Sequence, residues 1–546
     1  MPQPLAIRGQ GLRTAAGIGL AALRQAVSEG RTALAELPDE VGRGLPHTLG
    51  GRAPDLPESA ERGLLLAAEV VEAALEGVSP ERRAQIPLLV GTGLGPQEPR
   101  EAGLPASAQA FTEALAEGAG LDVARSLTYS VTCVSGLCAL ERARSAIAGG
   151  APAALVLGTE TLSRTIQGGF CALEALSASA SPGNPSPQDG IVLGEAACAL
   201  LLEPAEPGQV SLLGQGLVAD ACHATSPDSS GRGMREAIEV ALSEAGLEVR
   251  DLGWIALTAA GSPVYAATYA GALDALFGGG SWRERVVDWE GSVGHLLAAS
   301  GPVGLVYEQE LAQSVPGLAL TVGFGGLNGA SVVGPARAFE VTPAREVQVS
   351  ALATASEGAA DLEDAFPGRW DPRRRIPAEV APLAEAARQV LAGLGRWEPG
   401  QALPELGLVI AVDNHGERAA ARFGSALERE RPCSPAVFLN SLPSTPATTL
   451  SLLFGARGYQ ATLNAGRGGG AAALEEARWL VSQGIAPCVL AGALSLSGDG
   501  NQSLAALVVV EEAGSDSGSR SVNAPLEVQA ALQGLAVASF LESLAD

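Results

Sequence analysis

The stretch that most constrains this fold is residues 129–150, YSVTCVSGLCALERARSAIAGG. It begins with alternating apolar and polar side chains, which is typical of a strand. After the Ser135-Gly136 turn, apolar side chains recur at helical spacing, at positions 137, 140, 143 and 147. Gly149-Gly150 then ends the predicted helix. We therefore predict a strand, a sharp turn and a helix, with Cys133 at the elbow between them.

Two interpretations of Cys133 are open. A sulfur at this elbow would face the free N–H groups and the positive end of the helix, which favours a thiolate nucleophile. Alternatively, Cys133 is a small buried side chain that packs like alanine.

Composition narrows the classes of function. A chain of 546 residues with 47% apolar and 17% charged residues is expected to form several packed domains. The net charge of −25, without a long basic run, argues against a nucleic-acid partner. Seven cysteines without a CxxC pair predict neither a disulfide framework nor a metal site. No signal-peptide core and no apolar run of 18 residues is present, so we expect a cytoplasmic protein without a membrane span.

Strand and helix patterns alternate along the first 340 residues, which predicts an α/β fold with a mostly parallel sheet. The glycines GTGLG at 91–95 do not form a GxGxxG motif, and close packing explains them better than a dinucleotide site. Residues 295–299 are expected to be helical. The run GFGGLNG at 323–329 could present N–H groups to an anion or could be a plain turn between two strands.

Six motifs together resemble the β-ketoacyl-ACP synthases, in order and in spacing, over about residues 5–340. They are TCVSG, GGFCALEALS, DGIVLGEAACALLLE, DACHATSP, GSVGHLLAASG and GFGGLNG. The resemblance implies a thiolase-like, five-layered αβαβα fold made of two halves. It also implies a homodimer or a heterodimer with another ketosynthase-like subunit. Acyl chains would arrive on the phosphopantetheine arm of acyl carrier protein, and no other cofactor is implied.

The same resemblance assigns roles to three residues. Cys133 would carry the acyl chain as a thioester, and His295 would bind the malonyl carbonyl during decarboxylation. The N–H groups of Cys133 and Phe324 would form the oxyanion hole.

Two positions depart from the family pattern. Ala260 stands where the family has its first active-site His, and Glu290 stands where it has a Lys five residues before the second His. A missing donor typically costs about a hundred- to a thousand-fold in rate. A nearby Glu290 would also repel the negative charge of an enolate. We therefore expect acyl transfer to Cys133 to survive and condensation to be impaired. His223, in the DACH-like turn, is interpreted as structural.

An internal repeat marks the C-terminal third. Residues 467–497 align without a gap on residues 133–163, with ten of the 31 positions identical. Residues 345–512 would then be a degenerate second copy of the N-terminal half, with Arg467 in place of Cys133. This copy resembles the short partner proteins and chain-length factors of aryl-polyene and type II polyketide systems. Arg467 could bind a phosphate or carboxylate, or could pair with a local carboxylate in a dead site.

The predicted domains are 1–205 (N-terminal half), 206–340 (C-terminal half), 341–513 (degenerate half) and 514–546 (linker and amphipathic tail helix). The basic cluster at 373–375 could meet an acidic carrier protein or could be a solvated loop.

Two functional hypotheses remain. In the first, the chain is a ketosynthase-family acyltransferase of fatty acid or polyketide-type biosynthesis, with an incomplete Cys-His-His site. In the second, it is a non-catalytic, chain-length-factor-like or scaffold subunit that pairs with a competent ketosynthase.

Overall fold

The structure is a computed structural model that describes residues 3–513, except 182, 185–186, 308, 339–342, 359–361, 369–375, 414, 432 and 497–502. The basic cluster at 373–375 and the predicted linker and tail helix fall outside the described residues.

The described chain is built from three five-stranded units that share one strand order. In each unit the first strand along the chain lies next to the fifth, followed by the fourth, the second and the third. The first unit contains β1 (Leu5–Thr14), β5 (Pro87–Gly91), β6 (Asp122–Tyr129), β7 (Ala154–Glu160) and β9 (Ala196–Pro204). The second contains β10 (Val210–Ala219), β11 (Trp254–Leu257), β12 (Val286–Val287), β13 (Gly317–Gly323) and β14 (Leu327–Pro335). The third contains β15 (Val347–Ala355), β16 (Leu406–Asp413), β17 (Gln460–Leu463), β18 (Cys488–Leu496) and β19 (Ser503–Glu512).

The α/β fold class is confirmed, but the sheet is mixed rather than mostly parallel. In the first unit β5, β6 and β7 are parallel, whereas β9 runs antiparallel to both β7 and β1. The connections between the parallel strands contain helices, whereas β9 follows α8 (Arg164–Ala172) and the short strand β8 (Leu193–Gly194) and runs in the opposite direction.

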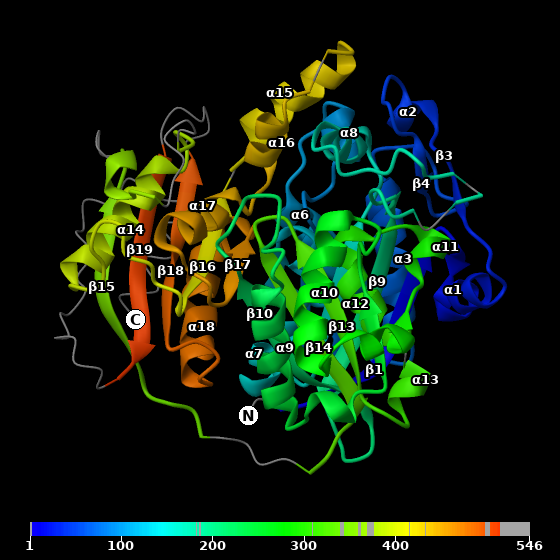
Figure 1. Ribbon diagram of the computed structural model, residues 1–546, viewed down its shortest axis with the longest axis horizontal. Helices are drawn as coiled ribbons and strands as arrows, with labels where there is room; N and C mark the ends of the chain where they lie inside the picture. The colour runs from blue at the N-terminus through cyan, green and yellow to red at the C-terminus, as the bar shows by residue number, and fades with distance from the viewer. Residues whose placement is uncertain are drawn as a thin grey trace.

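The first two units form the layers of a sandwich (Figure 1). Helices α7 (Ser135–Ala148) and α12 (Ser300–Tyr307) pack against each other, α7 on β5 and β7 and α12 on β13. Helices α3 (Arg62–Ala74) and α6 (Ala108–Ala119) cover the outer face of the first unit. Helices α9 (Arg232–Ala245) and α10 (Pro263–Phe277) cover the second, with α9 lying directly on its strands. This α-β-α-β-α order explains why α7 is buried on almost every side.

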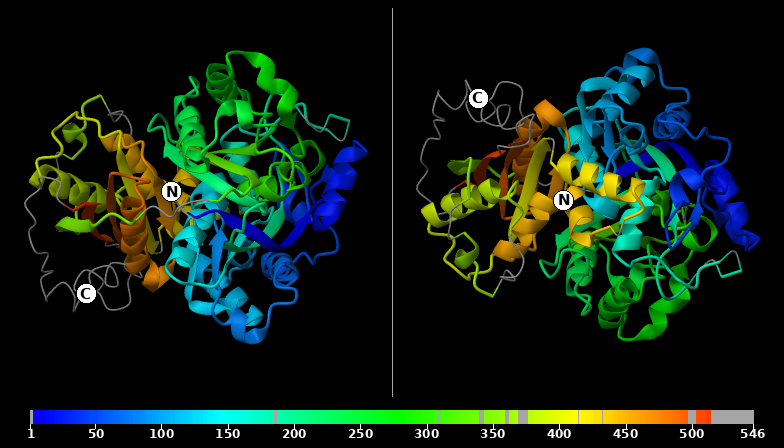
Figure 2. Two further views of the ribbon diagram at one scale, coloured as in Figure 1. Left: turned by 90° about the horizontal axis from the view of Figure 1, so that it is seen from below. Right: turned by 90° about the horizontal axis from the view of Figure 1, so that it is seen from above.

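The third unit extends the sheet of the first, edge to edge, so that its strands lie beside the first two units in Figures 1 and 2. Strand β17 pairs antiparallel with β6, with Leu463 opposite Tyr129. The Ser130 N–H donates to the Thr462 carbonyl at 3.0 Å. Across the junction, Arg142 of α7 bonds Glu475 of α18 (Gly469–Ser482) at 2.7 Å. The edge strand of the first unit is therefore paired within the same chain.

The internal repeat is visible in the local structure. Strand β6, the 3₁₀ turn η1 (Thr132–Val134), α7 and β7 match β17, η6 (Gly466–Gly468), α18 and β18 in order. Residues 352–355 continue the strand β15, because they pair with β19 after a shift in register.

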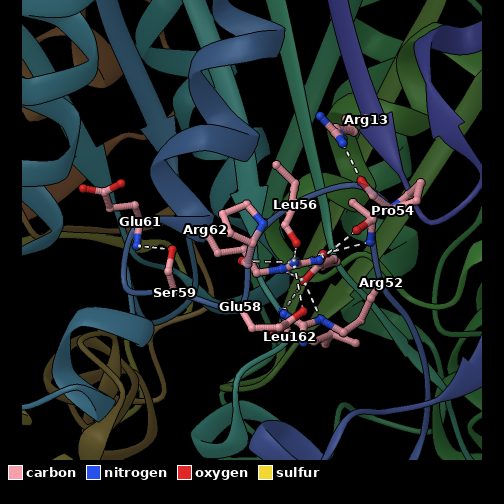
Figure 3. Close-up of polar contacts among 12 residues, drawn as sticks. Arg13, Arg52, Pro54, Leu56, Glu58, Ser59, Glu61, Arg62 and Leu162 are labelled. Carbon is pink, nitrogen blue, oxygen red and sulfur yellow. Dashed lines mark hydrogen bonds and ion pairs between the residues drawn. The ribbon is translucent and has the colours of Figure 1, made fainter.

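A buried network of ion pairs and hydrogen bonds surrounds Arg62 (Figure 3). The Glu195 carboxylate is fully buried and bonds Arg62, the Ala53 N–H at 2.8 Å and the Leu162 N–H at 3.2 Å. Breaking a buried pair typically costs about 3–5 kcal/mol, because one charge is left uncompensated. Glu195 directly follows β8 (Leu193–Gly194), and Gly194 bonds the backbone of His295.

Candidate active site

Cys133 lies at the predicted elbow, in η1 between β6 and α7. The preceding Thr132 has φ of +55°, an uncommon value for a β-branched residue, and this sharp reversal points the chain into the helix. A Cβ on Gly91 would come within 2.5 Å of the Gly136 backbone, so the last glycine of β5 serves close packing against α7. Cys133 itself is only 5% exposed.

His295 reaches Cys133 from an extended segment and not from a helix, which corrects the sequence expectation. Its backbone bonds Val192 and Gly194, and the 3₁₀ turn η4 (Leu297–Ala299) starts two residues later. His295 does not continue a helix because its backbone hydrogen bonds pair it with the β8 region. The His295 Nε2 atom lies 3.3 Å from the Cys133 Sγ atom.

Glu290 occupies the other side of the His295 ring. Its Oε1 atom is 2.8 Å from the His295 Nδ1 atom, and its Oε2 atom accepts the Ala259 N–H at 2.5 Å. Ser300 Oγ also lies 3.4 Å from Nδ1. The sequence placed Glu290 at a degenerate position and gave no sign that it would contact the ring. The spacing of five residues is a weak signal, because it does not show which way the intervening turn bends.

The charges of the pair are coupled. Burial disfavours the charged imidazolium, but the Glu290 carboxylate and the Cys133 sulfur outweigh it and raise the pKa of His295 to about 10. Burial raises the pKa of the Glu290 carboxyl, and His295 and the Ala259 N–H oppose this shift. His295 therefore holds its proton tightly, with the Glu290 carboxylate on the Nδ1 side of the ring and the Cys133 sulfur on the Nε2 side.

Phe324 lies in a turn between β13 and β14, so the GFGG run is a strand-to-strand turn. Gly325 and Gly326 have φ of +89° and +70°, a region that favours glycine. Thr132 Oγ1 donates to the Phe324 carbonyl at 3.3 Å, and a Cβ on Gly323 would lie 3.5 Å from the Cys133 nitrogen. The turn thus lies against the elbow. The assignment of the Cys133 and Phe324 N–H groups to an oxyanion hole stays a prediction.

The two remaining predicted positions lie in different units. Ala260 lines a cavity of about 160 Å³ together with Glu290 and His295. Arg467 belongs to η6 of the third unit, and its side chain is outside the described part of the chain. The structure therefore brings together Cys133, His295, Phe324 and the Ala260–Glu290 region, whereas Arg467 belongs to the corresponding elbow of the third unit.

A second cavity of about 20 Å³ lies against Cys133, and residues of the third unit help to close it. Phe438 of α16 (Pro435–Ser441) and the following Leu442 line it together with Phe170 and Phe324. A Cβ on Gly169 would come within 2.1 Å of the Phe438 ring, so the Gly168-Gly169 pair of α8 makes room for it. The glycine pair was the only sequence signal for this contact, and it did not identify the partner.

The seven cysteines are all free. Burial raises the pKa of the thiols of Cys138 and Cys198, and that of Cys171 to about 11. His223, interpreted as structural, accepts the N–H groups of Thr225 and Ser226 in its own turn.

Two family models match this chain where the elbow and the following half lie. The N-terminal domain of β-ketoacyl synthases matches residues 123–207, and the C-terminal domain matches residues 210–309. Over these two stretches the chain is similar to the β-ketoacyl synthases. A 3-oxoacyl-[acyl-carrier-protein] synthase 2 of Rhizobium meliloti (strain 1021) is 32% identical over 192 residues, which are 32% of this chain and 45% of that protein. The protein of the same name from Staphylococcus aureus is 29% identical over 127 residues, which are 22% of this chain and 32% of that protein. The matched region thus spans less than half the length of these curated relatives.

Solved ketosynthase structures share the fold. A structure titled PfaC keto synthase–chain length factor has a TM-score of 0.69 at 12% identity, and the match covers 93% of this chain and 78% of that one. A ketosynthase (ApeO) in complex with its chain length factor (ApeC) from Xenorhabdus doucetiae has a TM-score of 0.50 at 22% identity, covering 61% of this chain and 98% of that chain. The thiolase-like fold is therefore confirmed. Among the described residues, no helix has the length and apolar character needed to cross a membrane.

Proposed function

We propose that this protein is a ketosynthase-family acyltransferase that accepts an acyl group from an acyl-carrier-protein thioester onto Cys133. The observation that carries the proposal is the 3.3 Å contact between Cys133 Sγ and His295 Nε2 at the start of a buried helix. A base in contact with a thiol activates it as a nucleophile. The relatives named 3-oxoacyl-[acyl-carrier-protein] synthase 2 support the carrier as the source of the acyl group.

Condensation with a malonyl unit is proposed to be slow. Decarboxylation builds negative charge on the malonyl carbonyl, and that charge needs preorganised donors. Ala260 provides none, and the Glu290 carboxylate lies in the same cavity wall. The site therefore supports acyl transfer better than carbon–carbon bond formation.

The second candidate function is a non-catalytic, chain-length-factor-like subunit. The observation that favours it is the third unit, which holds the β6 edge and contributes Phe438 to the Cys133 cavity but has no cysteine at its own elbow. In our preferred proposal this unit serves as a built-in partner of the catalytic half. A further ketosynthase-like subunit would then have to bind elsewhere.

Intact-protein mass spectrometry distinguishes the two functions. The full chain is incubated with an acetyl-carrier-protein thioester, and peptide mapping locates the added mass. We expect one acetyl group on Cys133 in the wild type and none in Cys133→Ala, with Cys171→Ala as the control that retains loading. A wild-type chain that never gains an acetyl group and releases no acid would favour the subunit function.

A further inference from the structure

The contact between Glu290 and His295 changes what the ring can do. An ionised carboxylate only accepts hydrogen bonds, so the ring atom it faces at 2.8 Å, Nδ1, carries a proton. In the neutral ring, Nε2 is then a base that faces the Cys133 sulfur at 3.3 Å. If Nε2 carried the proton of the neutral ring, Nδ1 would be an acceptor and would need a hydrogen-bond donor next to it. Glu290 therefore selects the proton-accepting form of His295.

A backbone hydrogen bond and the neighbouring turn fix the position of the Glu290 carboxylate. Its second oxygen is fixed by the Ala259 N–H, and Ala259 has the uncommon φ of +53°. Glu290 opens the short helix α11 (Glu290–Val293), directly after the buried Trp289. The ring and the carboxylate are thus positioned like the second and third members of a nucleophile–base–orienter triad.

The cavity beside the pair provides room for water. Its volume is about 160 Å³. One water molecule in the liquid takes up roughly 30 Å³, so the cavity has room for several waters. Its wall includes Ala260, Gly261 and Val287 as well as the two members of the pair. The space next to Ala260, where a histidine donor is missing, is therefore adjacent to a base and a carboxylate.

We propose that Cys133, His295 and Glu290 form a catalytic triad that hydrolyses the acyl group carried by Cys133, so that the protein is a thioester hydrolase acting on carrier-bound acyl chains. The inference rests on the proposed loading of Cys133 and adds the fate of the acyl group. Attack by water needs a base and the same oxyanion stabilisation as the loading step, whereas decarboxylation of a malonyl extender needs a further donor, which Ala260 does not provide.

The two steps balance without a further reactant. In the first, the Cys133 sulfur attacks the carbonyl carbon of the carrier thioester and the bond to the pantetheine sulfur breaks. The proton of Cys133 passes through His295 to the departing thiol. In the second, a water oxygen attacks the carbonyl carbon on Cys133 while Nε2 of His295 takes a water proton. The bond to Cys133 breaks, the proton returns to its sulfur, and the free acid leaves.

The test compares wild type with Glu290→Gln, using the full chain and acetyl-pantetheine as the probe. Glutamine keeps the size of the side chain but can present a donor to Nδ1, which selects the wrong ring form. We expect free acetate to appear continuously with wild type. In Glu290→Gln, the limiting rate of acetate release at high pH should fall about a hundred- to ten-thousand-fold, and any acetyl-Cys133 that forms should persist longer than in wild type. Glu284→Gln, which removes an exposed carboxylate from the preceding turn, is the matched control and should behave as wild type.

A pH profile separates this positioning role from a merely structural one. Hydrolysis requires the unprotonated Nε2, so its rate should rise with pH in both proteins, with a lower midpoint in Glu290→Gln because the carboxylate no longer stabilises the imidazolium. Other titratable groups near the dyad are Tyr265 and Tyr269 beside Cys133 and Asp288 beside Glu290, and they are unchanged between the two proteins.

The outcomes are distinct. Acetyl-Cys133 that forms in wild type and persists for hours overturns the hydrolase inference but leaves the loading of Cys133 intact. Equal hydrolysis rates and equal pH midpoints in wild type and Glu290→Gln overturn the triad. If neither protein is acetylated and no acetate is released, the proposed function itself is wrong. If Glu290→Gln does not fold, the wild-type measurement alone decides, because a stable wild-type acyl-enzyme contradicts the inference.

Discussion

Phe438 of the third unit and Cys133 of the first line the same small cavity, although the two residues lie on opposite sides of the junction between β6 and β17. The Phe438 ring is 6.4 Å from Phe170 and 5.3 Å from Phe423, centroid to centroid. An aromatic cluster thus closes the space in which an acyl chain on Cys133 would lie. The degenerate unit therefore contributes to the site without contributing a nucleophile.

Phe438→Ala is expected to admit longer acyl chains. Removing the ring would join its volume to the cavity of about 20 Å³. We expect loading with octanoyl-pantetheine to rise at least tenfold relative to acetyl loading, measured by intact mass. Phe454→Ala is the control, because its ring packs on Phe366 and Trp397 in the core of the third unit. Both substitutions should cost about 3–5 kcal/mol in stability, so a gain seen with both would contradict the cavity argument.

Arg467→Ala should leave acetyl loading of Cys133 unchanged. The contacts of the third unit with the Cys133 cavity come from Phe438 and Leu442, whereas position 467 stands at the separate elbow before α18. The rate of loading, measured by rapid quench and mass spectrometry, checks this. A loss of loading with an unchanged melting temperature would assign the third unit a direct part in acyl transfer.

Cys133 should be the thiol most readily alkylated by iodoacetamide at neutral pH. Its sulfur lies 3.3 Å from His295 Nε2, which can take the thiol proton, whereas burial raises the pKa of the Cys171 and Cys488 thiols to about 11 each. The Cys222 residue is exposed overall. Partial burial of its thiol and the nearby Asp220 carboxylate raise the pKa of that thiol. Mass mapping after limited labelling should show Cys133 modified first, and earlier labelling of Cys222 would count against an activated nucleophile.

Ala260→His is expected to raise the decarboxylation of malonyl-carrier thioester at least tenfold. The substitution would restore a donor beside His295, and the cavity of about 160 Å³ has space for a ring. Combining it with Glu290→Lys should raise the rate further, because the carboxylate that opposes the developing enolate is removed. Ala260→Leu adds similar bulk without a donor and should show no gain. A wild type that already condenses at the rate of the double variant would mean that another group supplies the missing donor.

Stability should depend on pH through the His295–Glu290 pair. The pKa of His295 is raised from its ordinary value of 6.5 to about 10, so the folded state holds this proton more tightly than the unfolded state. The resulting stabilisation is complete below about pH 6.5 and is lost as the pH rises through 10. Urea unfolding at pH 6.5, 8 and 10 should show a decline in the free energy of unfolding that is smaller in Glu290→Gln. Equal declines would show that the carboxylate does not hold the proton on the ring.

The sequence alone determined the elements with strong local signals. The alternating strand, the glycine-punctuated turn and the helical spacing of 129–150 placed Cys133 at the elbow that the structure shows. The six ordered motifs indicated the α/β thiolase-like fold, and the gapless alignment of 467–497 on 133–163 indicated the third unit. These features are local patterns or order along the chain, which a linear sequence records directly.

The tertiary structure decided what those residues contact. His295 is extended because the backbone of β8 pairs with it, and residues 352–355 continue a strand because β19 pairs with them. Glu290 faces the His295 ring through a turn whose direction no periodicity encodes, and Phe438 reaches Cys133 only because β17 docks on β6. Contacts between segments far apart in the chain depend on how whole units pack, so the base-selecting carboxylate and the aromatic wall of the cavity emerge only once the units are assembled.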